Sequence, residues 1–129
     1  MIVLDTHAWL WWVSDPERLS PAAREAIDRS DAVGVCTISC WEVAVLVVRG
    51  RIGLDRDVGV WVEQALGHDR VRSLSLTPQV AVSAALLDQG RFEGDPADRI
   101  IFATARSRDS LLATKDARLR SFDPDGTIW

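Results

Sequence analysis

The sequence has no long hydrophobic run, which argues against a membrane-spanning segment. Its 129 residues are 47% hydrophobic and 26% charged, as in a globular protein, and no apolar stretch approaches the roughly 20 residues that cross a bilayer. The first residues lack the basic start and cleavage site of a signal peptide, because Asp5 interrupts the apolar run directly after Leu4. We therefore expect one globular domain, residues 1–129, located in the cytoplasm.

Cysteine and histidine are scarce, and this argues against a zinc site. Cys36 and Cys40 lie four residues apart, with no further cysteine and no nearby histidine to complete a set of ligands. We interpret both as small buried thiols. His7 and His68 are interpreted as structural or solvated residues.

Positive charge is in deficit. The chain carries 15 basic and 19 acidic residues, for a formal net charge of -4. This balance gives no overall field that attracts nucleic acid, and it counts mildly against such a partner. Any basic surface has to be local.

The sequence does contain short apolar strands that alternate with helical segments. Strands are expected at residues 2–4, 32–38, 71–76 and 111–113, with a last short strand at Ile128 and Trp129. Helices are expected at residues 7–13, 21–29, 39–48, within 55–67, and at 78–88 (closing near Gly90), 96–107 and 117–120. The alternation predicts an α/β fold with a mostly parallel sheet covered by helices on both faces.

Four acidic residues are expected at one edge of this sheet. Asp5 follows the first strand and Asp116 follows the strand at 111–113. If Ser39 caps the next helix, Glu42 lies in its first turn, and Asp98 lies in the first turn of the helix that Asp95-Pro96 opens. Ligands of open parallel sheets bind beyond the carboxyl ends of the strands, so the four carboxylates are expected to meet there.

Each acid also has a structural explanation. Glu42 and Asp98 would occupy the third helical position, where an acid caps backbone amides and interacts favourably with the helix dipole. Asp116 could be a helix cap or a surface group. Asp5 is the hardest to explain in this way, because it directly follows a buried apolar strand. The convergence of the four is the stronger argument.

A cluster of carboxylates favours a hard divalent cation. Without one, mutual repulsion raises the pKa values of some members, which then bind protons. Mg²⁺ and Mn²⁺ prefer oxygen ligands, so a site of acids alone favours one or two of these ions over zinc.

Four segments of the sequence resemble the motifs of PIN-domain nucleases, in particular the VapC-type toxins of bacterial toxin–antitoxin pairs. They cover the chain in order: IVLDTHAWLWW, SCWEVAVL, DPADRIIFATA and ATKDARL. The resemblance implies a three-layer α/β/α fold with strand order 3-2-1-4-5. It also implies a Mg²⁺- or Mn²⁺-dependent endoribonuclease, a cognate antitoxin, and a homodimer.

The resemblance also assigns residues to the site. By matching motifs, its acidic residues would be Asp5, Glu42, Asp98 and Asp116, with Asp98 fitting the family pattern better than the nearby Asp95. Thr6 and Thr114 match as well, and would orient carboxylates or a water molecule. Two basic residues that border the proposed site, Arg99 and Lys115, are expected to bind RNA phosphates.

Two other functions remain open on the sequence. One is phosphoryl transfer through an aspartyl phosphate, as in receiver domains or haloacid-dehalogenase-like phosphatases; it is disfavoured because His7 stands where the second aspartate of the dehalogenase pattern is needed, and Thr77-Pro78 where a receiver places its acceptor. The other is a binding module that keeps the fold without cleaving RNA. The helix with Trp9, Trp11 and Trp12 is either a protein interface or part of the core.

Overall fold

A computed structural model describes residues 1–87, 92 and 94–129 of the chain. Within these residues, five parallel strands form one sheet in the order β3-β2-β1-β4-β5. The strands are β1 (Ile2–Leu4), β2 (Val33–Cys36), β3 (Val71–Leu74), β4 (Leu111–Ala113) and β5 (Thr127–Ile128). The predicted strand order and the mostly parallel sheet are therefore confirmed.

The helices alternate with the strands along the chain. They are α1 (Thr6–Ser14), α2 (Pro21–Arg29), α3 (Thr37–Val48), α4 (Val58–Leu66), α5 (Pro78–Leu86), α6 (Pro96–Ser107) and α7 (Ala117–Phe122), with a short 3-10 turn at Pro16–Arg18. The bounds of α2 and α6 agree with the prediction. The expected end of the fifth helix, at Asp88 to Gly90, lies outside the described residues.

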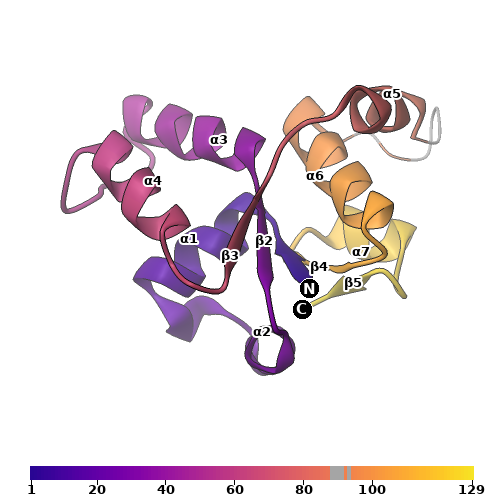
Figure 1. Ribbon diagram of the computed structural model, residues 1–129, viewed down its shortest axis with the longest axis horizontal. Coiled ribbons are helices and arrows are strands. Elements are labelled where there is room, and N and C mark those ends of the chain that lie inside the picture. The colour runs from indigo at the N-terminus through magenta and orange to yellow at the C-terminus, as the bar shows by residue number, and fades with distance from the viewer. Residues whose placement is uncertain (88–91, 93) are drawn as a thin grey trace.

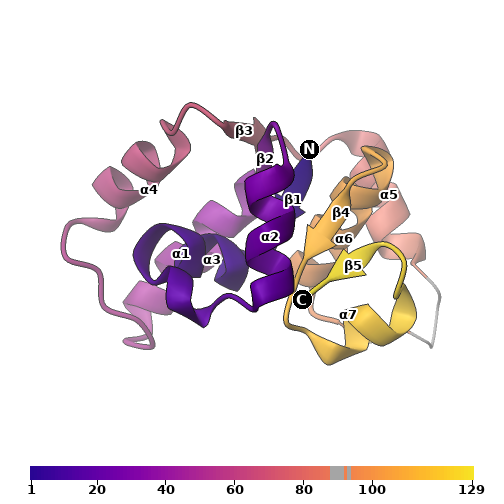
Figure 2. The same cartoon turned by 90° about the horizontal axis from the view of Figure 1, so that it is seen from below.

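The helices form two layers with the sheet between them (Figure 1). One hydrophobic cluster joins one face of the sheet to α1, α2, α3 and α4, and a second joins the other face to α5, α6 and α7. The view from below in Figure 2 shows α2 and β5 side by side, in agreement with their contacts. Because β1 is central and buried on both faces, the residue that follows it lies in the middle of the carboxyl edge.

The three tryptophans of α1 have different environments. Trp9 is fully buried and packs edge to face on Trp61, with ring centroids 5.1 Å apart. The core interpretation is therefore confirmed for Trp9. Trp11 and Trp12 are only partly buried.

The start of α3 differs from the prediction. Cys36 precedes the first helical residue, Thr37, and makes no side-chain cap hydrogen bond. Ser39 therefore lies inside the helix, where it is fully buried, and does not cap it. Glu42 accordingly lies in the second turn, so its predicted place in the first turn was wrong.

Both cysteines are free, and the interpretation as a buried thiol is confirmed for Cys36 only. Cys36 is buried, and Cys40 is half-buried. Burial raises the pKa of the Cys36 thiol to about 11. No helix within the described ranges combines the length and apolarity needed to span a membrane.

Candidate metal centre

The predicted acidic residues meet in one pocket at the carboxyl edge of the sheet. The pocket has a volume of about 460 Å³, and its wall includes all four predicted acids together with Asp95. The acids come from four separate segments: the end of β1, the middle of α3, the start of α6 and the start of α7. Asp5 and Asp116 lie at the same edge of the sheet, because they follow the neighbouring strands β1 and β4.

Asp5 is held in place by the backbone and by Thr114. Its carboxylate caps α1 by accepting a hydrogen bond from the amide of Ala8 at 2.7 Å, and it also accepts one from the Thr114 hydroxyl. Its own amide donates to the carbonyl of Ala113, next to it on β4. Burial is the main influence on Asp5 and raises its pKa, although both hydrogen bonds act in the opposite direction.

Glu42 is oriented by a pair of buried hydroxyls. The Thr6 hydroxyl is hydrogen-bonded to the Glu42 carboxylate and lies 3.0 Å from the Ser39 hydroxyl. Both Thr6 and Ser39 are buried, at 4% and 0% exposure. The sequence predicted that Glu42 lies in the first turn, where the backbone amides of the helix N-terminus would stabilise its carboxylate. Because Glu42 lies in the second turn of α3, the hydroxyls stabilise the carboxylate instead. Burial still raises the pKa of Glu42.

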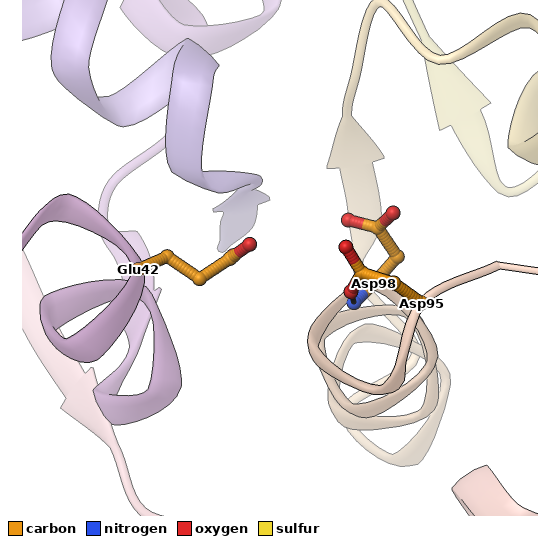
Figure 3. Close-up of side chains that lie close together, drawn as sticks. All are labelled: Glu42, Asp95 and Asp98. Atoms are coloured by element: carbon orange, nitrogen blue, oxygen red, sulfur yellow. Dashed lines mark hydrogen bonds between the residues drawn. The ribbon is translucent and has the colours of Figure 1, made fainter. Parts of the chain in front are cut away.

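Asp98 and Asp95 both lie at the start of α6. Asp95 is the cap residue, and its Oδ1 accepts hydrogen bonds from the amides of Ala97 at 3.0 Å and Asp98 at 3.3 Å. Figure 3 shows Glu42 extending from α3 toward the two aspartates. One carboxylate oxygen from each of Glu42, Asp95 and Asp98 lies within 4.8 Å of the others, close enough to share an ion.

Asp116 begins α7 and completes the acidic wall. Its carboxylate accepts hydrogen bonds from the amides of Arg118 at 2.8 Å and Leu119 at 3.4 Å, so the predicted cap is present. The Arg118 guanidinium lies 3.6 Å from the same carboxylate. The Asp116 amide donates to the Thr114 hydroxyl, so Thr114 connects Asp5 with Asp116.

The five acids of the pocket repel one another, and this repulsion contributes to a raised pKa at Asp98. Burial, followed by the negative charges of Asp95, Glu42, Asp116 and Asp5, raises the pKa of Asp98 to about 7. Its carboxyl group therefore binds a proton more tightly than an ordinary aspartate does in the metal-free protein. A hard divalent cation removes this repulsion, and the oxygen-only set of ligands fits one.

Arg99 is not brought into the pocket. Its guanidinium donates to the backbone carbonyls of Ala84, Ala85, Leu87 and Phe92 at 2.7 to 3.2 Å. These bonds tie α6 to the end of α5 and engage Nε and both terminal nitrogens. The geometry thus opposes the predicted phosphate contact and favours a structural role for Arg99.

Replacing Arg99 with alanine is expected to destabilise the fold. Four carbonyl groups lose a charged donor, three of them in partly buried hydrogen bonds. We expect this loss to lower the free energy of unfolding by about 2 to 3 kcal/mol. Urea denaturation measures this loss. Arg108→Ala, at an exposed arginine just beyond the end of α6, is the control and should change stability by less than about 0.5 kcal/mol. Unchanged stability with weakened RNA binding would instead support the phosphate contact.

Besides the acids and Thr6, three side chains line the pocket. Lys115, which was predicted, and His7, which was interpreted as structural or solvated, are both exposed. Trp11 is the third. A signal for His7 and Trp11 was present in the sequence: they lie two and six residues after Asp5 on one short helix, so one turn separates them on the same face.

A larger cavity, of about 760 Å³, lies between α1 and α4. Its wall includes Trp12, Trp61 and His68, but only one acidic residue, Asp55, which is exposed and bound to Arg56. Size alone would favour this cavity as a ligand site. The acidic pocket is the better candidate for a functional site, because several ionisable groups converge there and their pKa values are shifted.

Comparison with known proteins places these residues in a family context. The family model described as "PIN domain" matches residues 2–123. A curated protein, Ribonuclease VapC22 from Mycobacterium tuberculosis, is 45% identical over 120 residues, which is 93% of this chain and 90% of that protein.

Solved structures share the fold. A toxin–antitoxin complex from Klebsiella pneumoniae includes a chain with a TM-score of 0.72 and 18% identity, covering 100% of this chain and 97% of that one. VapBC2 from Rickettsia felis, bound to a DNA fragment from its promoter, includes a chain with a TM-score of 0.68 and 12% identity, covering 99% and 98%. At these identities the likeness concerns the fold alone.

Proposed function

This chain belongs to the PIN-domain family, and we propose that it is a metal-dependent endoribonuclease that acts as the toxin of a toxin–antitoxin pair. The main support for the proposal is the acidic pocket at the carboxyl edge of the sheet. Carboxylates from four distant segments converge in it, in a chain that is 45% identical to a protein named as a ribonuclease. Nucleases of this family use divalent metal, and the oxygen ligands agree with that.

We propose Asp5, Glu42, Asp98 and Asp116 as the residues that hold one or two ions of Mg²⁺ or Mn²⁺. Their support is the shared pocket and the raised pKa values of Asp5, Glu42 and Asp98, which burial causes. Asp95 lies within reach of the same ion and caps α6 through its Oδ1. Of this pair we assign the ligand role to Asp98, because Asp98 fits the family pattern better.

The reaction we propose is hydrolysis of an RNA phosphodiester. A bound dication supplies Lewis acidity: it lowers the pKa of water at the scissile phosphate and offsets charge on the leaving oxygen. Thr6 and Thr114 hold the carboxylates of Glu42 and Asp5 in fixed positions. Lys115 provides a positive charge for a phosphate at the pocket rim. Asp116 or Glu42 accepts the proton released by the attacking water.

Comparison with the structural neighbours also supports the proposal that this chain binds protein partners. The structural neighbours from Klebsiella pneumoniae and Rickettsia felis are a toxin–antitoxin complex and VapBC2 bound to a DNA fragment from its promoter. By analogy, we propose a cognate antitoxin for this chain, a homodimer, and a site of action in the cytoplasm, where its RNA substrates are. We propose that residues 1–129 act as one domain, because both hydrophobic clusters pack on the same sheet.

The two alternative functions are less well supported. For an aspartyl-phosphate enzyme, the structure offers Ser75, Leu76 and Thr77 after β3, with no acceptor aspartate among them. For a silent binding module, loss of acids from the pocket would be expected, whereas all four are present and close together.

The proposed function predicts metal-dependent cleavage of RNA. Purified protein is incubated with total RNA and Mn²⁺, with an excess of EDTA, or as the Asp5→Asn variant, and the products are separated on a denaturing gel. We expect cleavage only in the first sample, because both changes remove the bound ion. Equal cleavage in all three samples would contradict the proposal. Asp28→Asn, at an exposed aspartate on α2, is the control and should cleave like the wild type.

A further inference from the structure

An aromatic cluster with two cations lies at the rim of the acidic pocket. It is centred on Trp11, whose ring lies 5.6 Å from the ring of His7 and 5.7 Å from that of Trp129. The Lys115 ammonium is 5.8 Å from the Trp11 ring centroid, and the Arg18 guanidinium carbon is 5.3 Å from it. These five residues, which come from four segments of the chain, are called the Trp11 cluster below.

The Trp11 cluster is continuous with the pocket and open to solvent. His7, Trp11 and Lys115 belong to the wall that also contains the acids. His7, Lys115 and Arg18 are exposed, and Trp11 and Trp129 are partly exposed. Trp9, two residues away on the same helix, is by contrast fully buried in the core. The Trp11 cluster therefore lies at the surface of the site, while Trp11 and Trp129 also pack against the hydrophobic core beneath them.

The geometry of the Trp11 cluster leaves aromatic surface for a ligand. The ring planes of His7 and Trp129 are tilted by 51° and 56° from that of Trp11, so neither ring stacks flat on it. The two cations over the ring are on long, exposed side chains that can move to a phosphate.

A single-stranded nucleic acid has the complementary chemistry. Its unpaired bases stack on aromatic side chains, and its phosphates bind lysine and arginine. When a scissile phosphate lies at the acids, the neighbouring nucleotide is within reach of Lys115 and Trp11, because all of these groups belong to one pocket. A base stacked on Trp11 would hold the scissile phosphate in position next to the carboxylates.

Resting on the proposed function, we propose that the Trp11 cluster is a subsite for an unpaired nucleobase of the RNA next to the cleaved bond, with Trp11 as the stacking surface and Lys115 and Arg18 as phosphate contacts. Stacking is tolerant of base identity, so this subsite selects single-stranded RNA over duplex more than it selects a sequence. A segment of a protein partner is the competing occupant.

The test compares Trp11→Ala and Trp11→Phe in steady-state cleavage of a single-stranded RNA 12-mer with Mn²⁺. Trp11→Ala is expected to raise KM roughly tenfold with a smaller change in kcat, since one base–aromatic stack is lost. Trp11→Phe keeps a stacking ring and should stay within about threefold of the wild type. The Mn²⁺ concentration for half-maximal activity should not change in either variant.

The matched control is Trp12→Ala. Trp12 is also a partly buried tryptophan of α1, and it packs on a histidine, His68, at 5.1 Å, but it faces the larger cavity and not the acids. An equal rise in KM for Trp12→Ala and Trp11→Ala would indicate general loosening of α1 and would overturn the proposal. So would an unchanged KM for Trp11→Ala, or a loss of Mn²⁺ affinity that accounts for the whole effect.

A binding measurement separates this inference from the proposed function. In the Asp5→Asn background, fluorescence anisotropy of a labelled 12-mer should show about tenfold weaker binding when Trp11 is also replaced by alanine. An oligonucleotide in which every base is removed should bind equally to both proteins, because it keeps only the phosphates. Trp11-dependent binding without any cleavage by the wild type would reject the nuclease and keep the subsite. Binding that is insensitive to Trp11 and to the bases would reject the subsite alone.

Discussion

Replacing Asp98 with asparagine is expected to abolish most of the activity and yet to stabilise the metal-free protein. We expect kcat/KM for RNA to fall roughly 100- to 1,000-fold, which corresponds to about 3 to 4 kcal/mol of lost transition-state stabilisation. Asparagine keeps the size of the side chain but provides a weaker, neutral ligand. The same change removes one negative charge from a group of five acids in one pocket.

The gain in stability follows from the state of Asp98 in the absence of metal. Burial and the neighbouring carboxylates raise its pKa to about 7, so its charged form is destabilised by the fold around it. An uncharged amide does not carry this electrostatic cost. Replacing a residue of a functional site often raises stability for such a reason. We expect the melting temperature in EDTA to rise, and the further rise on adding Mn²⁺ to be much smaller than in the wild type.

Scanning calorimetry with and without Mn²⁺, together with the cleavage assay, measures both effects. The exposed Asp28→Asn serves again as the control and should change neither quantity. A variant that loses activity and also loses stability in EDTA would show that the Asp98 carboxylate holds the fold together, and would contradict the account of strained charge.

Raising the pH is expected to destabilise the metal-free wild type. An unfolded aspartate has a pKa near 3.8, whereas the pKa of Asp98 in the folded protein is about 7. Between these values the folded state binds the proton more tightly than the unfolded state, so stability falls as the pH rises through this window. Asp5 and Glu42, whose pKa values are also raised by burial, act in the same direction.

We expect a loss of about 1 to 2 kcal/mol between pH 5 and pH 8 in EDTA, a value that allows for solvent screening of the partly exposed Asp98. Mn²⁺ should restore the stability at pH 8 and have little effect at pH 5, where protons occupy the carboxylates. Urea denaturation at the two pH values measures this. A metal-free protein that gains stability from pH 5 to pH 8, or one that Mn²⁺ stabilises equally at both, would be inconsistent with clustered acids that compete for protons and metal.

Much of the site was predictable because it depends on strand ends. Asp5 directly follows β1 and Asp116 comes shortly after β4, and these two parallel strands are neighbours in the sheet. The carboxyl ends of parallel strands lie at one edge of the sheet, independently of the loop conformations. Asp98 was placed correctly because Asp95-Pro96 is a strong helix start in the sequence, and α6 begins there.

Glu42 was assigned to the right pocket for a wrong local reason. Ser39 and Glu42 have the spacing of a capping box, which predicts a helix start at Ser39. In the structure the cap residue of α3 is Cys36, three residues earlier, and the Ser39 hydroxyl bonds to Thr6 of another helix. A local motif cannot reveal this, because the competing partner is 33 residues away in the chain.

The structural role of Arg99 could not be predicted from the sequence. Its position beside Asp98 suggested a phosphate contact, but its partners are carbonyls near the end of α5, which only the packing of α5 on α6 brings within reach. His7 was missed for a related reason. Its spacing from Asp5 on the same helix is a signal in the sequence, but this spacing points to the pocket only once the acids are located in space.

Anomalous diffraction from a manganese-soaked crystal shows whether carboxylates remote in the chain bind a shared dication. We expect an anomalous peak in the pocket, in contact with carboxylate oxygens of Asp98 and of at least two among Asp5, Glu42 and Asp116. The peak should disappear in a crystal of Asp98→Asn grown under the same conditions. A peak elsewhere on the molecule, or an empty pocket at saturating manganese, would contradict this expectation.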